Sequence, residues 1–347
     1  MSDVLGASEP VKPQFHAVEF RGSGSEFFRI WIVNLALTLV TLGIFSAWAK
    51  VRTRRYFYGN TFIGGHAFDY HADPVRILIG RAIAAGLFIG YNVSGRISPW
   101  LAIPWIVALA FGVPWLIVAS QRFNARNTSY RNVRFNFTGD YWGAFKAFIL
   151  WPIAGAVTLG GLVPLAHRAR DYFLINNRTF GGKTFKTAID GWSIYSIYLI
   201  ALFWVVSAIV ALVLLGVIVA MVTATLKVMA AAPMPVPPRQ AFVFIAAFSL
   251  VFLVMETGLI VYIWTRVFNL AVNNTYIDGR HRIDARMAAW PLIGIGLSNI
   301  FFLIFTLGMF YPWARVRVAN YMADRMGLYA TSNLDEFTSE AFGAQSA

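Results

Sequence analysis

The sequence contains no cysteine among its 347 residues, which excludes disulfide bonds, thiolate metal ligands and a cysteine nucleophile. Charged residues are also scarce, at 13% of the chain, whereas hydrophobic residues make up 58%. A soluble domain carries charged side chains at roughly 25% of its positions. We therefore expect much of this chain to face lipid rather than water, as in an integral membrane protein.

Sequence signatures of enzymes are missing as well. There is no Walker motif, no G-x-S-x-G, no H-E-x-x-H, and no G-x-G-x-x-G after a strand. His66 and His71 lie near Asp69 and Asp73, but their spacing fits no zinc signature. The first 25 residues are polar and of mixed charge, without the apolar core of a signal peptide. The sequence thus indicates no catalytic residue, no metal site and no cofactor, and nothing in it argues for an enzyme.

Acidic residues are few: 16 Asp and Glu stand against 29 Lys and Arg, for a formal net charge of +13. Such a surplus can serve nucleic-acid binding, but in a membrane protein Lys and Arg are retained in cytoplasmic loops. Five segments hold 21 of the 29 basic residues: 50–76, 121–137, 167–186, 266–286 and 315–325. We therefore expect these segments and both chain termini in the cytoplasm, and no nucleic acid as a partner.

Apolar runs suited to membrane helices occur at residues 75–91, 100–120, 192–225 and 241–264. Three further apolar segments, 27–47, 145–165 and 292–311, leave the number of crossings open. Seven single crossings would place two basic segments outside the cell, although inverted repeats of this kind occur in transporters. If the three segments are instead re-entrant or broken helices, four helices cross and every basic segment lies inside. We prefer the second arrangement.

The chain repeats itself at fixed offsets, which indicates one structural unit used more than once. Residues 20–68 match residues 137–185, the middle of the unit recurs at residues 299–321, and Thr-Leu-Gly marks the same place in each copy. The sequence therefore predicts an all-α membrane protein, a multi-pass helical bundle of two and a half repeats. The expected divisions are a mobile N-terminal tail at 1–13, repeat 1 at 14–130, repeat 2 at 131–282, a partial repeat 3 at 283–325 and a C-terminal tail at 326–347.

Short β-hairpins are expected at four places in the basic segments. The turn signals are Gly64-Gly65, Gly181-Gly182, Asp278-Gly279 and, more weakly, Arg131-Asn132. Gly-Gly and Asp-Gly suit turns that need positive φ. Residues 14–22 alternate like a further strand. Because strand backbone cannot face lipid, these pieces should lie outside the hydrocarbon on the cytoplasmic side, where they could pair into one small sheet.

Glu256 is a carboxylate well inside an apolar run, ten residues before Arg266 or roughly 15 Å along a helix. Ionisable groups are costly at this depth and often mark ion or proton paths. Together with Asn34, Asn299 and Arg81, Glu256 forms our candidate intramembrane polar site. The alternative is structural, with a protonated glutamate and two asparagines that join helices through hydrogen bonds.

Cations alternate with aromatic residues in two stretches, 48–58 and 313–321, as in interfacial helices that lie on anionic lipid. The candidate lipid contacts are Lys50, Arg52, Arg54, Arg55, Arg315 and Arg317. The alternative is that these charges serve only to fix the topology.

The stretch F-R-G-S-G-S-E-F-F-R-I-W, followed by T-L-G-I-F-S-A-W-A-K-V-R-T-R-R-Y-F-Y-G-N-T, resembles the YjgN-type family of bacterial inner-membrane proteins. The resemblance extends from about residue 15 to residue 321. It implies a multi-pass protein of the bacterial cytoplasmic membrane with its C-terminus inside, and it brings no catalytic residue, substrate or cofactor. The middle copy departs from the pattern, because Trp48-Ala-Lys-Val-Arg becomes Leu165-Ala-His-Arg-Ala.

Two classes of function remain open from the sequence. One is a transporter or channel built around the intramembrane polar site. The other is a non-catalytic membrane scaffold whose basic cytoplasmic face binds anionic lipid or a partner protein, and a homo-oligomer fits either class. A polar cavity lined by Asn34, Glu256 and Asn299 would favour the first class, and a solid apolar core would favour the second.

Overall fold

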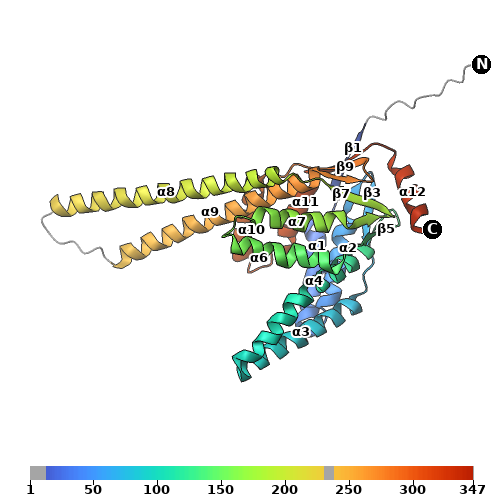
Figure 1. Cartoon of the computed structure of the whole chain (residues 1–347), viewed down its shortest axis with the longest axis horizontal. Coiled ribbons are helices and arrows are strands. Elements are labelled where there is room, and N and C mark those ends of the chain that lie inside the picture. The colour runs from blue at the N-terminus through green and yellow to red at the C-terminus, as the bar shows by residue number, and fades with distance from the viewer. Residues whose placement is uncertain (1–12, 230–237, 347) are drawn as a thin grey trace, which may run out of the picture.

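A computed structural model describes residues 13–229 and 238–346 of the chain (Figure 1). The predicted N-terminal tail, residues 1–13, therefore lies outside the described residues except for its last position. The strands are β1 (Gln14–Phe20), β2 (Thr61–Ile63), β3 (His66–Tyr70), β4 (Thr128–Tyr130), β5 (Val133–Phe137), β6 (Arg178–Phe180), β7 (Lys183–Thr187), β8 (Thr275–Ile277), β9 (His281–Ala285) and β10 (Met326–Ala330). The helices are α1 (Gly24–Val40), α2 (Ser46–Gly59), α3 (Pro74–Ile97), η1 (Pro99–Leu101), α4 (Ala102–Arg126), α5 (Tyr141–Phe145), η2 (Lys146–Leu150), α6 (Trp151–Val157), α7 (Val163–Asn176), α8 (Gly191–Met229), α9 (Pro238–Asn273), α10 (Ala289–Phe305), α11 (Tyr311–Ala323) and α12 (Leu334–Ser346).

The expectation of an all-α fold is wrong, because the strands close into an antiparallel barrel in the order β1-β10-β9-β8-β7-β6-β5-β4-β3-β2. Each isolated hairpin would leave two edges of unpaired backbone N–H and C=O groups. Pairing with the neighbouring hairpins satisfies these groups and removes the edges. Strands from the two ends of the chain complete the ring, with Gln14 of β1 opposite Ala330 of β10.

The four hairpin turns occur at the residues that carry the turn signals. Both central residues of each turn have positive φ, for example 53° and 79° at Gly64 and Gly65, and 50° and 65° at Arg131 and Asn132. This combination matches the right-handed twist of the flanking strands. Because helices join every hairpin at its open side, all four turns lie at one end of the barrel. We call this end the barrel mouth, formed by residues 64–65, 131–132, 181–182 and 278–279.

Between successive hairpins the chain runs out along one helix and returns along another. Two of these helical pairs are long, α3 with α4 and α8 with α9, and Figure 1 shows the second pair projecting furthest from the sheet. Three pairs are shorter: α1 with α2, the α5–η2–α6 run with α7, and α10 with α11. The helices of these five pairs therefore lie on the side of the barrel opposite to its mouth.

The three shorter pairs reverse direction at the three Thr-Leu-Gly sequences. Their leucines all have left-handed backbone: φ is 48° at Leu42, 51° at Leu159 and 50° at Leu307. The hydroxyl of Thr306 accepts a hydrogen bond from the backbone N of Phe310 at 3.0 Å, and the other two threonines make the same contact. A leucine at this φ is strained, so the turn is held by the packing of the two helices that flank it.

Among the described residues, four helical segments are long and apolar enough to cross a membrane, judged by length and composition: Pro74–Ile97, Ile103–Arg126, Gly191–Val222 and Phe252–Asn273. Two shorter apolar helices, Tyr141–Val157 and Ala289–Phe305, belong to the shorter pairs. The four long segments lie in α3, α4, α8 and α9, so both long pairs consist of candidate spans.

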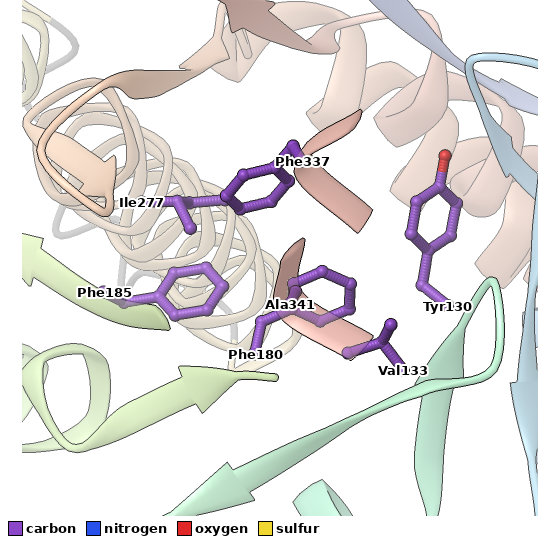
Figure 2. Packing of buried hydrophobic residues seen from close by; sticks show 7 residues of the cluster. All are labelled: Tyr130, Val133, Phe180, Phe185, Ile277, Phe337 and Ala341. Carbon is purple, nitrogen blue, oxygen red and sulfur yellow. The ribbon is translucent and has the colours of Figure 1, made fainter. Parts of the chain in front are cut away.

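The barrel interior near the mouth is packed with apolar side chains (Figure 2). The buried cluster comprises Tyr130, Val133, Phe180, Phe185, Ile277, Phe337 and Ala341. The first five come from strands, whereas Phe337 and Ala341 come from α12. The sequence assigned residues 326–347 to a tail, but β10 and α12 lie there, and α12 closes the barrel mouth.

Candidate functional site

Two of the predicted polar residues are hydrogen-bonded to two of the predicted lipid contacts. Arg52 Nη1 donates to Asn34 Oδ1 at 3.1 Å within the α1–α2 pair. Arg317 Nη1 donates to Asn299 Oδ1 at 2.8 Å within the α10–α11 pair. Both asparagines are buried, with 3% and 7% of their surface exposed. Each contact joins the two helices of one short pair, and the matching positions of the middle copy, 151 and 169, carry tryptophan and alanine instead.

The other two members of the predicted polar site lie apart from these pairs. Glu256 is exposed on α9, and within the described residues no hydrogen bond or ion pair joins it to another side chain. Arg81, on α3, donates to the hydroxyl of Ser46 at the start of α2. The structure therefore brings Arg81 to the short α1–α2 pair and does not link it to Glu256.

The six predicted lipid contacts share an electrostatic property. None of them forms an ion pair with a carboxylate in the described part of the chain, where ten ion pairs involve other residues. Lys50, Arg52 and Arg315 are exposed. The Arg315 guanidinium lies 5.3 Å from the ring centre of Phe57, a cation–π contact that does not cancel its charge. These side chains supply positive charge that no carboxylate of the described residues neutralises.

Three cations converge where α2 meets α3. Although Lys50 is exposed overall, partial desolvation of its ammonium group first, and then the charges of Arg54 and Arg81, lower its pKa from the ordinary value. Arg54 Nη1 donates to the hydroxyl of Tyr70 at 2.8 Å and also to Asn124, so its guanidinium is fixed in place. An anion placed here would relieve the mutual repulsion of the three cations, and we refer to Lys50, Arg54 and Arg81 as the basic cluster.

Two open surface depressions lie among the described residues, and neither is lined by Glu256, Asn34 or Asn299. One, of about 390 Å³, is lined by Arg55, Gly59, Ala67, Phe68, Asp69, Ser129, Arg131 and Asn132. The other, of about 340 Å³, is lined by Trp151, Leu165, Arg168, Ala169 and Tyr172. The first lies on the outside of the barrel beside β3 and β4, and the second lies within the middle helical pair.

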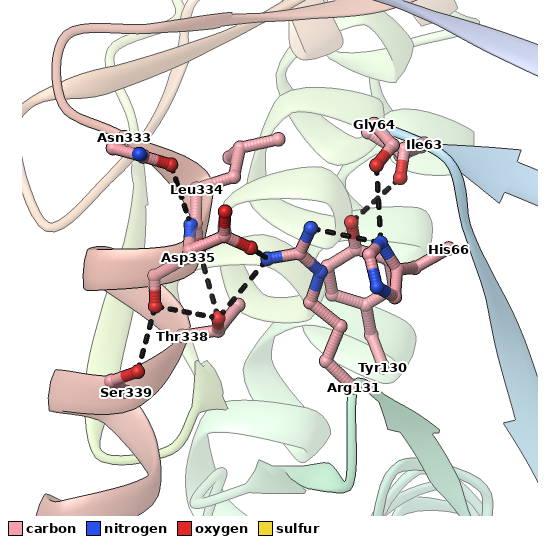
Figure 3. A network of polar contacts seen from close by, with 10 residues as sticks. All are labelled: Ile63, Gly64, His66, Tyr130, Arg131, Asn333, Leu334, Asp335, Thr338 and Ser339. Atoms are coloured by element: carbon pink, nitrogen blue, oxygen red, sulfur yellow. Dashed lines mark hydrogen bonds and ion pairs between the residues drawn. The ribbon is translucent and has the colours of Figure 1, made fainter.

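Sequence reasoning missed the residues that hold α12 in the barrel mouth. Arg131, in the β4–β5 turn, donates to the carboxylate of Asp335 (Figure 3). Lys183 Nζ, at the start of β7, lies 3.3 Å from Oε2 of Glu340. The C-terminal segment did contain a sequence signal for an amphipathic helix, because its apolar residues recur at helical spacing between acidic ones. This pattern is weak because it extends over only one short stripe.

Comparisons with known proteins find a family model and curated relatives. The family model described as "Bacterial protein of unknown function (DUF898)" matches residues 15–347. The inner membrane protein YjgN of Salmonella typhimurium is 31% identical over 152 residues, which cover 42% of this chain and 38% of that protein. Its Escherichia coli O157:H7 counterpart is 28% identical over 148 residues, covering 42% of this chain and 37% of the relative.

The matched segments thus span less than two-fifths of the length of these curated relatives. No solved structure matches the chain. The resemblance to YjgN-type proteins is confirmed, and since the family model covers nearly the whole sequence, this chain belongs to the DUF898 family of bacterial proteins.

Proposed function

We propose that this protein is a non-catalytic scaffold of the bacterial inner membrane that binds anionic lipid through helices α2 and α11. The observation that carries the proposal is that all six predicted contacts on these helices lack a carboxylate partner among the described residues. Unneutralised cations beside apolar helices fit the anionic headgroup layer, where each Lys or Arg contributes about 1 kcal/mol. The names of the relatives and the four candidate spans support the membrane location.

The tips of the three short helical pairs support a re-entrant arrangement. The exposed fractions of their leucines are 95% at Leu42, 98% at Leu159 and 95% at Leu307. Neighbouring Val40, Val157 and Phe305 are also about 80% exposed. Exposed apolar side chains on these turns are unfavourable in water, and their free energy falls when they are transferred into hydrocarbon. In the proposed arrangement these tips enter the hydrocarbon and the chain leaves again on the side where it entered.

The lengths of the short pairs are consistent with partial insertion. The 17 residues of α1 span ~26 Å at 1.5 Å per residue, whereas the hydrocarbon core is ~30 Å thick. Strand backbone must stay outside the hydrocarbon, so the barrel belongs at the surface, on the side that holds the basic segments. We therefore propose a multi-pass protein with four crossings, both termini in the cytoplasm and the barrel mouth turned away from the membrane.

The lipid proposal is tested by neutralising two cations that make no hydrogen bond within the described structure, in the double variant Lys50→Gln/Arg315→Gln. The matched control is Arg21→Gln/Arg286→Gln, which removes two cations that are paired with Glu19 at 2.7 Å and Asp284 at 2.9 Å. At about 1 kcal/mol per charge, the first variant should lose roughly thirtyfold in affinity for phosphatidylglycerol, titrated into the protein in neutral detergent. Equal affinity of both double variants for phosphatidylglycerol would indicate that Lys50 and Arg315 serve only to fix the membrane topology.

Transport or channel activity is the second candidate function. Glu256 lies within the candidate span Phe252–Asn273 and has no side-chain partner in the described structure. An unpaired carboxylate in a membrane helix is costly, and such groups commonly lie on proton or ion paths. This candidate needs a cavity or a subunit contact at Glu256, whereas the scaffold proposal needs neither.

A further inference from the structure

The barrel mouth contacts α12 through three of its turns, at residues 64–65, 131–132 and 181–182, and through His281, which follows the fourth turn. A Cβ on Gly64 would lie 2.8 Å from Leu334 Cδ1, and a Cβ on Gly181 would lie 2.6 Å from that of Ala341. Lys183 Nζ contacts both Glu340 and Asp278, at 3.3 Å and 3.1 Å. With the Arg131–Asp335 contact, α12 therefore lies across the whole mouth. Glycine is needed at position 181 because a Cβ there would meet the backbone of Ala341, whereas a Cβ at position 64 would meet only the end of the Leu334 side chain.

The docked face of α12 is a single apolar stripe. Leu334, Phe337, Thr338 and Ala341 occupy positions i, i+3, i+4 and i+7, and all four are buried. Phe337 enters the mouth, with its ring centre 5.9 Å from that of Phe180 and 4.3 Å from that of His281. This spacing of anchors is the one by which amphipathic helices bind in apolar grooves.

The rim of the mouth is basic and the flanks of α12 are acidic. Figure 3 shows the Arg131 guanidinium between Asp335, Thr338 and His66. Only 12% of the Arg131 side chain and 20% of the Lys183 side chain are exposed, so both charges point into the contact. Ion pairs at such a rim add modest affinity, but they select partners of complementary charge.

The barrel near α12 also contains buried polar atoms to which the described residues offer no hydrogen-bond partner. His16 Nε2, Arg131 Nε and His281 Nε2 are buried and make no hydrogen bond within the described structure. Buried polar atoms without hydrogen-bond partners are costly. A helix that offered partners to these atoms would bind more tightly than α12 does. At 13 residues, α12 would in addition be only marginally helical by itself.

We propose that the barrel mouth is a docking site for an acidic amphipathic helix of a partner protein, and that α12 occupies it as an internal competitor. The partner helix carries the same chemistry as α12: apolar anchors at i, i+3 and i+7, with carboxylates placed to meet Arg131 and Lys183. Because the mouth lies opposite to the helical pairs, the site is independent of the proposed lipid contacts. The +13 net charge of the chain favours an acidic partner over a basic one.

The test uses full-length protein in neutral detergent and a fluorescent peptide with the sequence of residues 331–346. In Ala341→Trp the indole cannot fit against Gly181, so α12 should leave the mouth while the barrel stays intact. The matched control is Glu336→Trp, on the exposed face of α12. We expect Ala341→Trp to bind the peptide at least tenfold more tightly than the wild type and the control do. Adding Arg131→Glu should abolish this binding, and an Asp335→Arg peptide should restore it.

A second variant that displaces α12 from the barrel mouth, here called a released variant like Ala341→Trp, keeps the test decisive if Ala341→Trp does not fold. Asp335→Lys/Glu340→Lys sets lysines against Arg131 and Lys183, and should expose the mouth by repulsion alone. The proposal is overturned if neither released variant, folded by its melting profile, binds the peptide, or if the wild type binds it equally well. A wild-type dimer that becomes monomeric in Ala341→Trp would show that the occupant is α12 of a second copy, which also overturns the partner proposal.

Discussion

The guanidinium of Arg317 donates a 2.8 Å hydrogen bond to the side-chain oxygen of Asn299, a residue buried between α10 and α11. The same contact joins Arg52 to Asn34 between α1 and α2. In both cases 18 residues separate the partners along the chain. We interpret these contacts as struts that hold the two helices of a short pair together, with the arginine charge reaching towards the headgroup layer.

Breaking one strut should destabilise the protein. Asn299→Ala leaves the Arg317 guanidinium without its acceptor, and we expect a loss of about 1–3 kcal/mol in the free energy of unfolding. Arg317→Gln should cost a similar amount, and the double variant less than the sum, because the partners are coupled. Chemical unfolding in detergent measures the free energy of unfolding for the wild type, both single variants and the double variant, which together form a double-mutant cycle. Asn92→Ala, an exposed asparagine on α3, is the control, and simple additivity at Asn299 and Arg317 would contradict the strut.

Spin labels can report the depth of the short-pair tips, because the chain has no native cysteine. Single cysteines at Leu42, Leu159 and Leu307 should be accessible to oxygen, which dissolves in lipid, and protected from a water-soluble nickel chelate. Lys186→Cys, exposed on β7, should show the opposite pattern. Tips accessible to the chelate would place them in water, as seven crossings require, and would contradict the re-entrant arrangement.

Glu256→Gln and Glu256→Leu separate the two candidate functions. If Glu256 carries protons, liposomes with the wild-type protein should dissipate a pH gradient, and both variants should lose this activity because neither side chain titrates. If the protein is a scaffold, neither variant should change proton flux, and Glu256→Leu should raise thermal stability by removing a carboxyl that has no partner among the described residues of an apolar helix. Flux that differs between the wild type and Glu256→Gln would favour transport over the scaffold.

His281 should make the seating of α12 dependent on pH. Burial first, and then Arg280, lower the pKa of His281 below its ordinary 6.5. The other charges near it are Asp278, Glu340 and Lys183. Its Nδ1 accepts a hydrogen bond from the backbone N of Thr331, which precedes α12.

Because the folded state favours neutral His281, the unfolded chain binds more protons, and stability should fall as pH drops from 6.5 towards the lowered value. Protonation also removes the acceptor for Thr331. The melting temperature, measured between pH 8 and pH 5.5, should therefore decrease more in the wild type than in His281→Gln. Identical pH profiles would show that His281 does not control this region.

Much of the local structure could be predicted from the sequence. The Gly-Gly and Asp-Gly dipeptides define three hairpin turns because few residues other than glycine tolerate positive φ without strain. The Thr-Leu-Gly sequences mark the reversals of the short helical pairs, since the threonine hydroxyl caps a turn within four residues of itself. The sequence also indicated that Asn34 and Asn299 could form hydrogen bonds between helices. It did not indicate that their partners are Arg52 and Arg317, which were predicted to contact lipid.

The closed barrel and the seat of α12 were decided by tertiary structure. Strands such as Thr61–Ile63 have three residues, too few for an alternating pattern to stand out beside long apolar helices. Closure depends on β1 pairing with β10, across almost the whole length of the chain, and no local signal encodes that contact. The amino-acid sequence by itself determined the turns, the apolar helices and the positive surface, because these depend on neighbouring residues. Only the folded chain could show which edges meet and what fills the barrel mouth, because those choices satisfy backbone groups and bury apolar surface between segments far apart in sequence.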